Sequence, residues 1–256
     1  MNWAVKQLRT GMAGRPWLVW LHGLLGDGDD WAPVLPYFAD WPLATLDLPG
    51  HGGSGAIMAE NFTAVSRGLA QTLASLRIEN YVLIGYSLGG RIALFHACRH
   101  NPPGLRALFV EGAHPGLNNQ AEREQRWRHD EAWAQRFAQQ PLPAVLTDWY
   151  RQPVFSDLSA EQRHSLIVLR SRNQGAAVAA MLAATSLARQ PDLLLSIQAM
   201  TLPFGYLCGE HDDKFSTLAR QSALPYTLVA DAGHNAHRAN PSAFADQLRS
   251  LLAPFG

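Results

Sequence analysis

Apolar runs of strand length recur along the chain, and segments with helical spacing lie between them. The predicted buried strands are residues 16–21, 42–46, 81–84, 105–110, 203–208 and 226–230. From residue 62 to residue 76, apolar side chains recur on one side of a predicted helix. Because strands alternate with helices, we predict an α/β fold with a mostly parallel central sheet flanked by helices. Such sheets bind ligands where their strands end.

The pattern changes between residues 113 and 191. This stretch has no convincing strand, and its helical patterns are interrupted by prolines. We therefore predict a core built from residues 1–112 and 192–256, with residues 113–191 inserted as a helical cap.

One predicted strand leads into a glycine-rich turn and then into an amphipathic segment. Residues 85–89 read Gly-Tyr-Ser-Leu-Gly, which fits G-x-S-x-G with Ser87 at its centre. A strand, sharp turn and helix would hold this serine in a strained conformation, exposed at the sheet edge near the positive end of a helix. An ordinary glycine-rich turn, in which the serine has no catalytic role, would show the same five-residue pattern.

Two later strands end in loops that carry partners for a serine nucleophile. Asp212 follows the strand at 203–208, and His234 follows the strand at 226–230. The order Ser87, Asp212, His234 is typical of the α/β-hydrolase fold. His234 would take the hydroxyl proton, and Asp212 would orient the imidazole. Asp213 is the alternative acid.

The same loops are rich enough in acids and histidines to suggest a metal site. The residues concerned are His211, Asp212, Asp213, His234 and His237. We expect no metal, because no H-E-x-x-H or comparable ligand pattern is present. His22 and His237 are expected to support or pack against the site.

The first buried strand ends in a loop with the sequence His-Gly-Leu-Leu-Gly-Asp, residues 22–27. Backbone N–H groups of this loop, at Gly23 or Leu24, could join that of Leu88 in an oxyanion hole. An ordinary strand-ending turn would have the same composition. In the turn-rich loop 47–55, Asp47 and Ser54 are expected to satisfy backbone groups.

Charge and cysteine content narrow the range of partners. Lys+Arg and Asp+Glu both number 21, so nothing suggests nucleic acid or an acidic membrane surface, and a small molecule is the expected partner. Cys98 and Cys208 are too few for a disulfide framework. The first residues lack the pattern of a secretory signal and no apolar run is long enough for a membrane span, so we expect a cytoplasmic protein.

Arginines are concentrated in the predicted cap. They are Arg123, Arg126, Arg128, Arg136, Arg151, Arg163, Arg170 and Arg172. Most are expected on solvated faces. A basic cap over a serine nevertheless suggests a carboxylated substrate, since arginine grips carboxylates with two hydrogen bonds.

With these motifs, the chain resembles the 2-succinyl-6-hydroxy-2,4-cyclohexadiene-1-carboxylate synthases of menaquinone (vitamin K2) biosynthesis, a family of lyases with the α/β-hydrolase fold. The matching stretches are 21–23 with 26–27, 47–54, 85–91, 111–117, 169–171 with 173 and 175–176, 206–210 with 212 and 214–215, and 233–238.

The resemblance implies elimination of pyruvate from a substrate with three carboxylates, without a metal or organic cofactor. Ser87, deprotonated with the help of His234, would act as a base. The residues implied to bind substrate are Tyr86, Arg91, Arg126, Trp149 and Arg170. Arg123 is the alternative to Arg126, because the spacing is uncertain there. We expect a monomer or weak homo-oligomer.

Two other functions fit the same motifs. A serine hydrolase, such as an esterase, thioesterase or carbon–carbon bond hydrolase for an acidic molecule, would use one triad and one oxyanion hole in the same way. A small-molecule receptor that has lost catalysis would keep the fold, but the complete set of Ser87, Asp212 and His234 argues against it.

Overall fold

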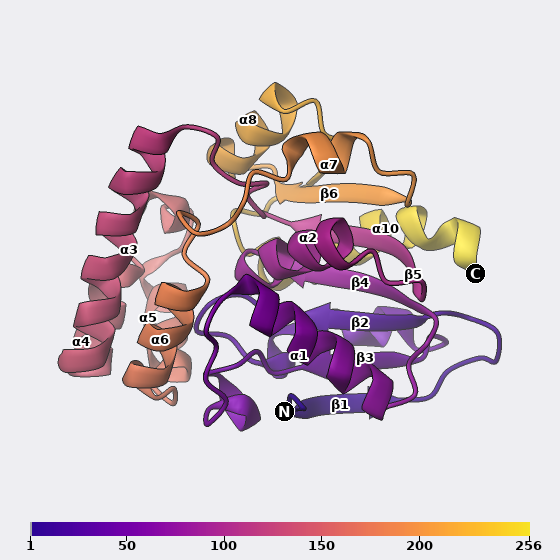
Figure 1. Cartoon of the computed structure of the whole chain (residues 1–256), viewed down its shortest axis with the longest axis horizontal. Helices are drawn as coiled ribbons and strands as arrows, with labels where there is room; N and C mark the ends of the chain where they lie inside the picture. The colour runs from indigo at the N-terminus through magenta and orange to yellow at the C-terminus, as the bar shows by residue number, and fades with distance from the viewer. Residues whose placement is uncertain (1) are drawn as a thin grey trace.

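A seven-stranded sheet forms the centre of the computed structural model, which describes residues 2–256 (Figure 1). In spatial order the strands are β1 (Val5–Arg9), β3 (Leu43–Leu46), β2 (Trp17–Leu21), β4 (Tyr81–Tyr86), β5 (Leu105–Glu111), β6 (Phe204–Gly209) and β7 (Tyr226–Val229). β1 runs antiparallel to β3, and every other neighbouring pair is parallel. The predicted mostly parallel sheet is confirmed.

β1 was not predicted from the sequence. Its residues, Val-Lys-Gln-Leu-Arg, do not form an apolar run, because the strand lies at the edge of the sheet and none of its side chains is fully buried. Its identity as a strand comes from pairing with β3.

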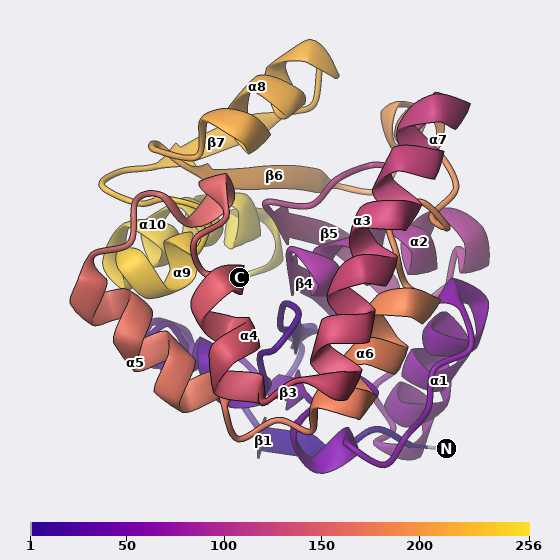
Figure 2. The same cartoon turned by 90° about the vertical axis from the view of Figure 1, so that its left-hand side faces the viewer.

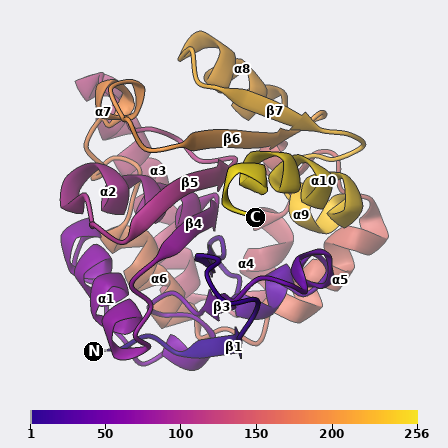
Figure 3. The ribbon, with the colours of Figure 1, turned by 90° about the vertical axis from the view of Figure 1, so that its right-hand side faces the viewer.

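Helices lie on both faces of the sheet and beyond the ends of its strands. The helices of the described residues are α1 (Phe62–Ser75), α2 (Leu88–His100), α3 (Gln120–Gln139), α4 (Leu142–Trp149), α5 (Ala160–Arg170), α6 (Gly175–Ala184), α7 (Leu194–Gln198), α8 (Asp213–Gln221), α9 (Ala236–Ala239) and α10 (Pro241–Leu252). Figure 3 shows α1 and α2 on one side of the sheet and α10 on the other. Side chains alternate between these faces: Val19 and Leu21 belong to the apolar cluster that includes α1 and α2, whereas Leu18 and Trp20 belong to the cluster that includes α10.

The helices α3 to α6 lie between β5 and β6 in the chain and gather beyond the carboxyl ends of the parallel strands (Figures 1 and 2). They have an apolar core of their own, which includes Phe137, Leu146 and Val178. Leu25, from the loop after β2, is buried in the same core. The sheet edge and these helices therefore enclose the space where ligands of parallel sheets bind.

The loop after β3 is fixed by its own side chains. Asp47 accepts hydrogen bonds from the N–H groups of Gly28 and Gly53, and Ser54 Oγ accepts one from Ala4 N–H. The prediction that both side chains satisfy backbone groups is confirmed. None of the helices formed by residues 2–256 is both long and apolar enough to cross a membrane.

Candidate active site

Ser87 lies in the sharp turn between β4 and α2. Its backbone has φ 49° and ψ −107°, a conformation that residues other than glycine rarely adopt. Leu88 begins the helix directly after it. The flanking glycines are required for space. A Cβ atom on Gly85 would lie 2.6 Å from the Gly89 carbonyl oxygen, and one on Gly89 would lie 2.3 Å from the Leu21 carbonyl oxygen. The structure thus places Ser87 in the strained turn that the pattern predicted.

His234 and Asp212 meet at the same edge of the sheet. His234 Nδ1 is 2.7 Å from Asp212 Oδ2, and both side chains are buried. Asp212 is also held by the Phe215 N–H, which donates to its other oxygen, and the Phe215 ring stacks on the imidazole at 4.7 Å. Since Asp212 holds Nδ1, Nε2 is the nitrogen free to accept a proton. Asp213, the alternative acid, is exposed at the start of α8.

A cavity of about 290 Å³ opens onto Ser87 and His234. Its apolar walls come mainly from the segments that cap the sheet edge and include Trp149, Phe155 and Leu182. Arg91, Arg126 and Lys214 also line the cavity. No aspartate or glutamate is among its lining residues within the part of the chain that the structure describes.

Arg91 is a buried guanidinium without an acidic partner. One turn into α2, it is 8 % exposed, and its Nη1 donates to the Thr185 carbonyl at 2.7 Å and to Gln190 Oε1 at 3.3 Å. No carboxylate of residues 2–256 lies within ion-pair distance of it. Burial, followed by repulsion from Arg126, lowers the pKa of Arg91, so an anion in the cavity would be strongly favoured.

Arg126, not Arg123, faces the cavity. Arg126 Nε donates to Asp130 at 2.8 Å, and Asp130 also accepts from Ser186 Oγ. Arg123 instead donates to the carbonyl oxygens of Leu117 and Gln190 and is outside the Ser87 cavity. The structure therefore gives Arg123 a role in holding the loop before α7.

Lys214 and two histidines were not identified from the sequence as cavity residues. Lys214 Nζ lies 5.3 Å from the centre of the Phe215 ring, and burial and Arg126 lower the pKa of its ammonium. His129 and His114 also line the cavity. Burial, Arg91 and Lys214 lower the pKa of His114 to about 3. The available signal was position, since Lys214 follows Asp212 closely, in the first turn of α8.

Arg170 lies outside the Ser87 cavity, although the resemblance implies that it binds substrate. Its Nη2 is 2.7 Å from Asp30 Oδ1, both side chains are buried, and Arg170 lines a separate cavity of about 100 Å³. Asp30 also binds Arg238 at 3.1 Å. Burial lowers the pKa of Arg170, but Asp30 and the Tyr150 hydroxyl together outweigh burial and raise it.

Of the two aromatic residues implied to bind substrate, the structure places one in the cavity. Trp149 lines it. Tyr86 is buried outside it, with its ring 5.3 Å from that of His234 and 4.8 Å from that of His237. Burial raises the pKa of the Tyr86 hydroxyl well above its ordinary value.

Two buried neutral histidines hold the loop after β2. Leu48 N–H donates to His22 Nε2, so His22 Nδ1 carries the proton and donates to the Gly23 carbonyl at 2.7 Å. Leu25 N–H donates to His51 Nε2, and burial lowers the pKa of His51 to about 3. His22 thus has the supporting role expected for it.

Leu24 and Leu88 both line the Ser87 cavity, whereas Gly23 does not. Leu88 is the first residue of α2, and the first N–H groups of a helix have no partner within it. A Cβ atom on Gly23 would lie 2.6 Å from the Tyr86 ring, so Gly23 is needed for close packing. Leu24 and Leu88 are therefore the better-placed pair for an oxyanion hole.

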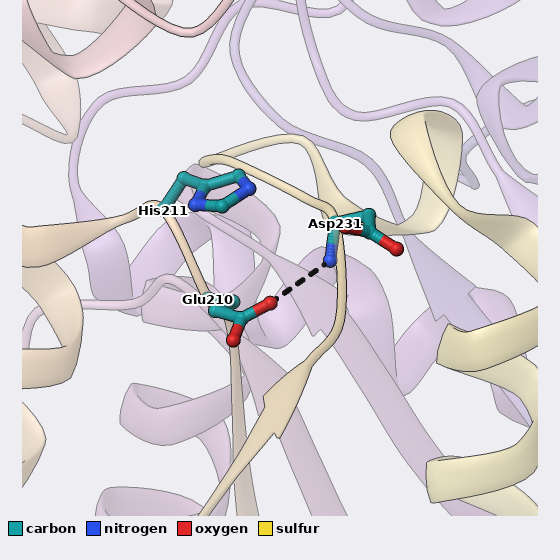
Figure 4. A group of neighbouring side chains, drawn as sticks. All are labelled: Glu210, His211 and Asp231. Carbon is teal, nitrogen blue, oxygen red and sulfur yellow. Dashed lines mark hydrogen bonds between the residues drawn. The ribbon is translucent and has the colours of Figure 1, made fainter.

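Of the residues considered as metal ligands from the sequence, only His211 belongs to the group that the structure brings together. Within residues 2–256, ligand atoms of Glu210, His211 and Asp231 lie within 4.8 Å of one another. All three are exposed, and Glu210 accepts a hydrogen bond from the Asp231 backbone N–H (Figure 4). This group lies outside the Ser87 cavity. His234 and His237 are instead bound to Asp212 and Glu111.

Comparison with known proteins places this arrangement in a family. Residues 16–237 match the family model of the α/β hydrolase fold. A 2-succinyl-6-hydroxy-2,4-cyclohexadiene-1-carboxylate synthase of Pectobacterium atrosepticum is 56% identical over 239 residues, which cover 93% of this chain and 94% of that protein. A synthase of the same name from Serratia proteamaculans is 51% identical over 97% of this chain and 98% of its own length.

Solved structures agree with this placement. The structure of MenH from S. aureus superposes with a TM-score of 0.90 at 26% identity and covers 97% of both chains. A carboxylesterase structure from Nitrososphaera gargenis, at 20% identity and a TM-score of 0.77, shares the fold. From the strained Ser87 turn, the Asp212–His234 contact and these similarities, the chain belongs to the 2-succinyl-6-hydroxy-2,4-cyclohexadiene-1-carboxylate synthase family of the α/β-hydrolase fold.

Proposed function

We propose that this protein is a carbon–oxygen lyase of menaquinone biosynthesis. Its substrate is 2-succinyl-5-enolpyruvyl-6-hydroxy-3-cyclohexene-1-carboxylate, from which it eliminates pyruvate to give 2-succinyl-6-hydroxy-2,4-cyclohexadiene-1-carboxylate. Relatives at 51% and 56% identity carry the name of this synthase, which supports the assignment.

One observation carries the proposal most directly. The cavity at Ser87 contains three basic side chains, and none of the lining residues among 2–256 is acidic. Two of these cations, Arg91 and Lys214, have no ion-pair partner in the same range. Leaving the buried Arg91 guanidinium unpaired is costly unless a ligand supplies the opposite charge. The substrate has three carboxylates, one for each of Arg91, Arg126 and Lys214.

In the proposed reaction, His234 Nε2 takes the proton of Ser87 Oγ, while Asp212 stabilises the charged imidazole. The Ser87 oxygen then removes a proton from the carbon beside the succinyl ketone. The developing enolate oxygen receives hydrogen bonds from the N–H groups of Leu24 and Leu88. As electrons move through the ring, the carbon–oxygen bond to the enolpyruvyl group breaks, and the leaving enolate takes the proton held by His234 to become pyruvate, which leaves Ser87 protonated and His234 neutral again.

Residues 113–191 act as the cap in this proposal, over a core of residues 1–112 and 192–256. Support comes from Trp149 and Arg126, which belong to the segment and line the Ser87 cavity, and from the separate apolar core of the cap helices. A cytoplasmic location and a monomeric or weakly oligomeric state stay predictions.

The direct test supplies purified protein with the enolpyruvyl substrate and follows pyruvate with lactate dehydrogenase. Because this substrate also eliminates spontaneously, the rate is compared with that of buffer. Release well above the buffer rate supports the lyase. A rate equal to that of buffer contradicts it, and trapping of an acyl group on Ser87 during turnover would indicate a serine hydrolase instead.

Loss of Arg91 or Lys214 is expected to weaken substrate binding. Each charge-assisted hydrogen bond to a carboxylate contributes about 1.5–3 kcal/mol, so Arg91→Met should raise KM roughly ten- to a hundred-fold. Lys214→Met should raise KM less, because the lysine is more exposed. Steady-state pyruvate release measures both effects.

Arg128→Met is the matched control for these variants. Arg128 lies on α3 near Arg126, is exposed and does not line the Ser87 cavity. Its KM should equal that of the wild type. Unchanged KM and kcat in Arg91→Met would remove the basis for a carboxylate at this position.

A further inference from the structure

A second buried contact between a histidine and a carboxylate lies beside the catalytic one. Glu111 ends β5, and His237 lies in α9 shortly after His234. His237 Nδ1 is 2.7 Å from Glu111 Oε2, and the His237 backbone N–H donates to Glu111 Oε1 at 3.2 Å. Both side chains are 1 % exposed. A single carboxylate in the protein interior therefore holds the start of α9 at two points.

Aromatic rings surround this contact. The His237 ring centre lies 4.3 Å from that of Trp31, 4.8 Å from that of Tyr86 and 6.1 Å from that of Phe244. His237 Nε2 is buried and has no hydrogen-bond partner among residues 2–256. Such surroundings have a low local dielectric, so the two hydrogen bonds to Glu111 are strong and their loss is costly. The contact between Glu111 and His237 therefore fixes the start of α9 to the end of β5.

The backbone of Glu111 reaches the nucleophile. Ser87 N–H donates to the Glu111 carbonyl oxygen at 2.8 Å. Glu111 therefore binds the serine turn through its main chain and the segment behind the catalytic base through its side chain.

Gly112 brings the same strand end against the catalytic imidazole. Its φ is +55°, and a Cβ atom there would lie 2.7 Å from His234 Cε1. The main chain directly after Glu111 thus borders the His234 ring. If His237 shifted relative to Glu111, the spacing between His234 and Ser87 would change with it.

We propose that Glu111 and His237 are positioning residues that fix His234 relative to Ser87. Neither residue lines the Ser87 cavity, so neither contacts the substrate. The inference rests on the proposed roles of Ser87 and His234. Misplacing the base slows proton transfer without removing a carboxylate ligand, so variants at Glu111 and His237 should lower kcat and leave KM unchanged. Loss of Arg91 should do the reverse and raise KM.

The decisive comparison is between His237→Leu and His237→Asn. The asparagine amide nitrogen can take the place of Nδ1 and donate to Glu111, whereas leucine fills the space without a donor. We expect His237→Leu to lower kcat roughly tenfold to a hundred-fold. His237→Asn should recover most of this loss. Both variants should keep the wild-type KM for the enolpyruvyl substrate.

Glu111→Gln covers the case in which His237→Leu does not fold. Glutamine keeps the size of the side chain and an acceptor for the His237 backbone N–H, but removes the negative charge. Its kcat should fall with KM unchanged, and thermal unfolding reports whether each variant is folded.

An activity-independent readout separates this inference from the proposed reaction. The proton between His234 Nδ1 and Asp212 should give a low-field NMR signal, identified by its loss in His234→Gln. This signal should shift or broaden in His237→Leu and stay in place in His237→Asn. If the wild type releases no pyruvate, the proposed function fails, and this signal still tests the positioning.

The inference is overturned if folded His237→Leu and Glu111→Gln keep the wild-type kcat and leave the Asp212–His234 signal unmoved. A fall in kcat that only follows the fraction of unfolded protein would also overturn it, because that result indicates a contribution to stability alone.

Discussion

Ser87→Ala should lower kcat for pyruvate elimination by about a thousand-fold or more. The hydroxyl oxygen is the proposed base, and its removal leaves only the oxyanion hole and the bound geometry to promote elimination. The rate of spontaneous elimination is subtracted before comparison with the wild type. A kcat within tenfold of the wild-type value would show that Ser87 does not remove the proton.

The Ser87→Ala variant is expected to fold as the wild type does. The strained backbone of residue 87 is set by the turn between β4 and α2, and its N–H bond to Glu111 does not need the side chain. KM should therefore change little, since the cations Arg91, Arg126 and Lys214 are intact. A large rise in KM would indicate that the substitution disturbs the cavity.

Asp30→Asn should lower the free energy of unfolding by about 3–5 kcal/mol. Asp30 and Arg170 are both buried, and removing the carboxylate leaves the guanidinium charged and unpaired in the interior. Arg170 also has a buried Nε without a partner among residues 2–256, and the neutral Tyr150 hydroxyl beside the guanidinium cannot replace the lost negative charge. Denaturant unfolding measures the change.

Arg238→Met is the control for Asp30→Asn. Arg238 binds the same carboxylate but is 29% exposed, so its loss should cost less than about 1 kcal/mol. Asp30→Asn with wild-type stability would contradict the structural role of the ion pair. It would leave Arg170 available for the substrate-binding role that the family resemblance implies.

The ion pair also connects the core, the cap and the segment after the catalytic histidine. Asp30 precedes Trp31 in a short helical turn on the core, Arg170 ends α5 in the cap, and Arg238 lies in α9 behind the catalytic histidine. One carboxylate therefore connects three parts of the molecule that are distant in the sequence. Its loss should loosen the cap as well as lower stability.

The sequence by itself determined the sheet and its reactive edge. Buried parallel strands are recognisable as apolar runs, because both of their faces are covered, and the glycines around Ser87 are required wherever a strand turns sharply into a helix. The triad of Ser87, Asp212 and His234 was predicted because each residue follows a predicted strand and the three occur in the order typical of the fold. β1 escaped prediction because an edge strand is defined by its pairing and not by burial.

Only the tertiary structure decided which charged residues share the cavity. Composition shows that the cap is basic. Side chains project from all sides of a helix, however, and the packing of the helix decides which of them face the cavity. Arg126 and Arg123 are less than one turn apart on α3, yet one faces the cavity and the other binds Gln190. Arg170 pairs with Asp30, 140 positions away, and this contact cannot be predicted from local sequence.

The same reason applies to Lys214, Glu111 and His237. Their local sequences show ordinary polar residues at a strand end or in a helix. Their partners come from other strands and loops, so their burial, pairing and distance from Ser87 exist only after the sheet edge has assembled. The sequence determined which chemistry is available, and the tertiary packing decided which charges are left unpaired to receive a substrate.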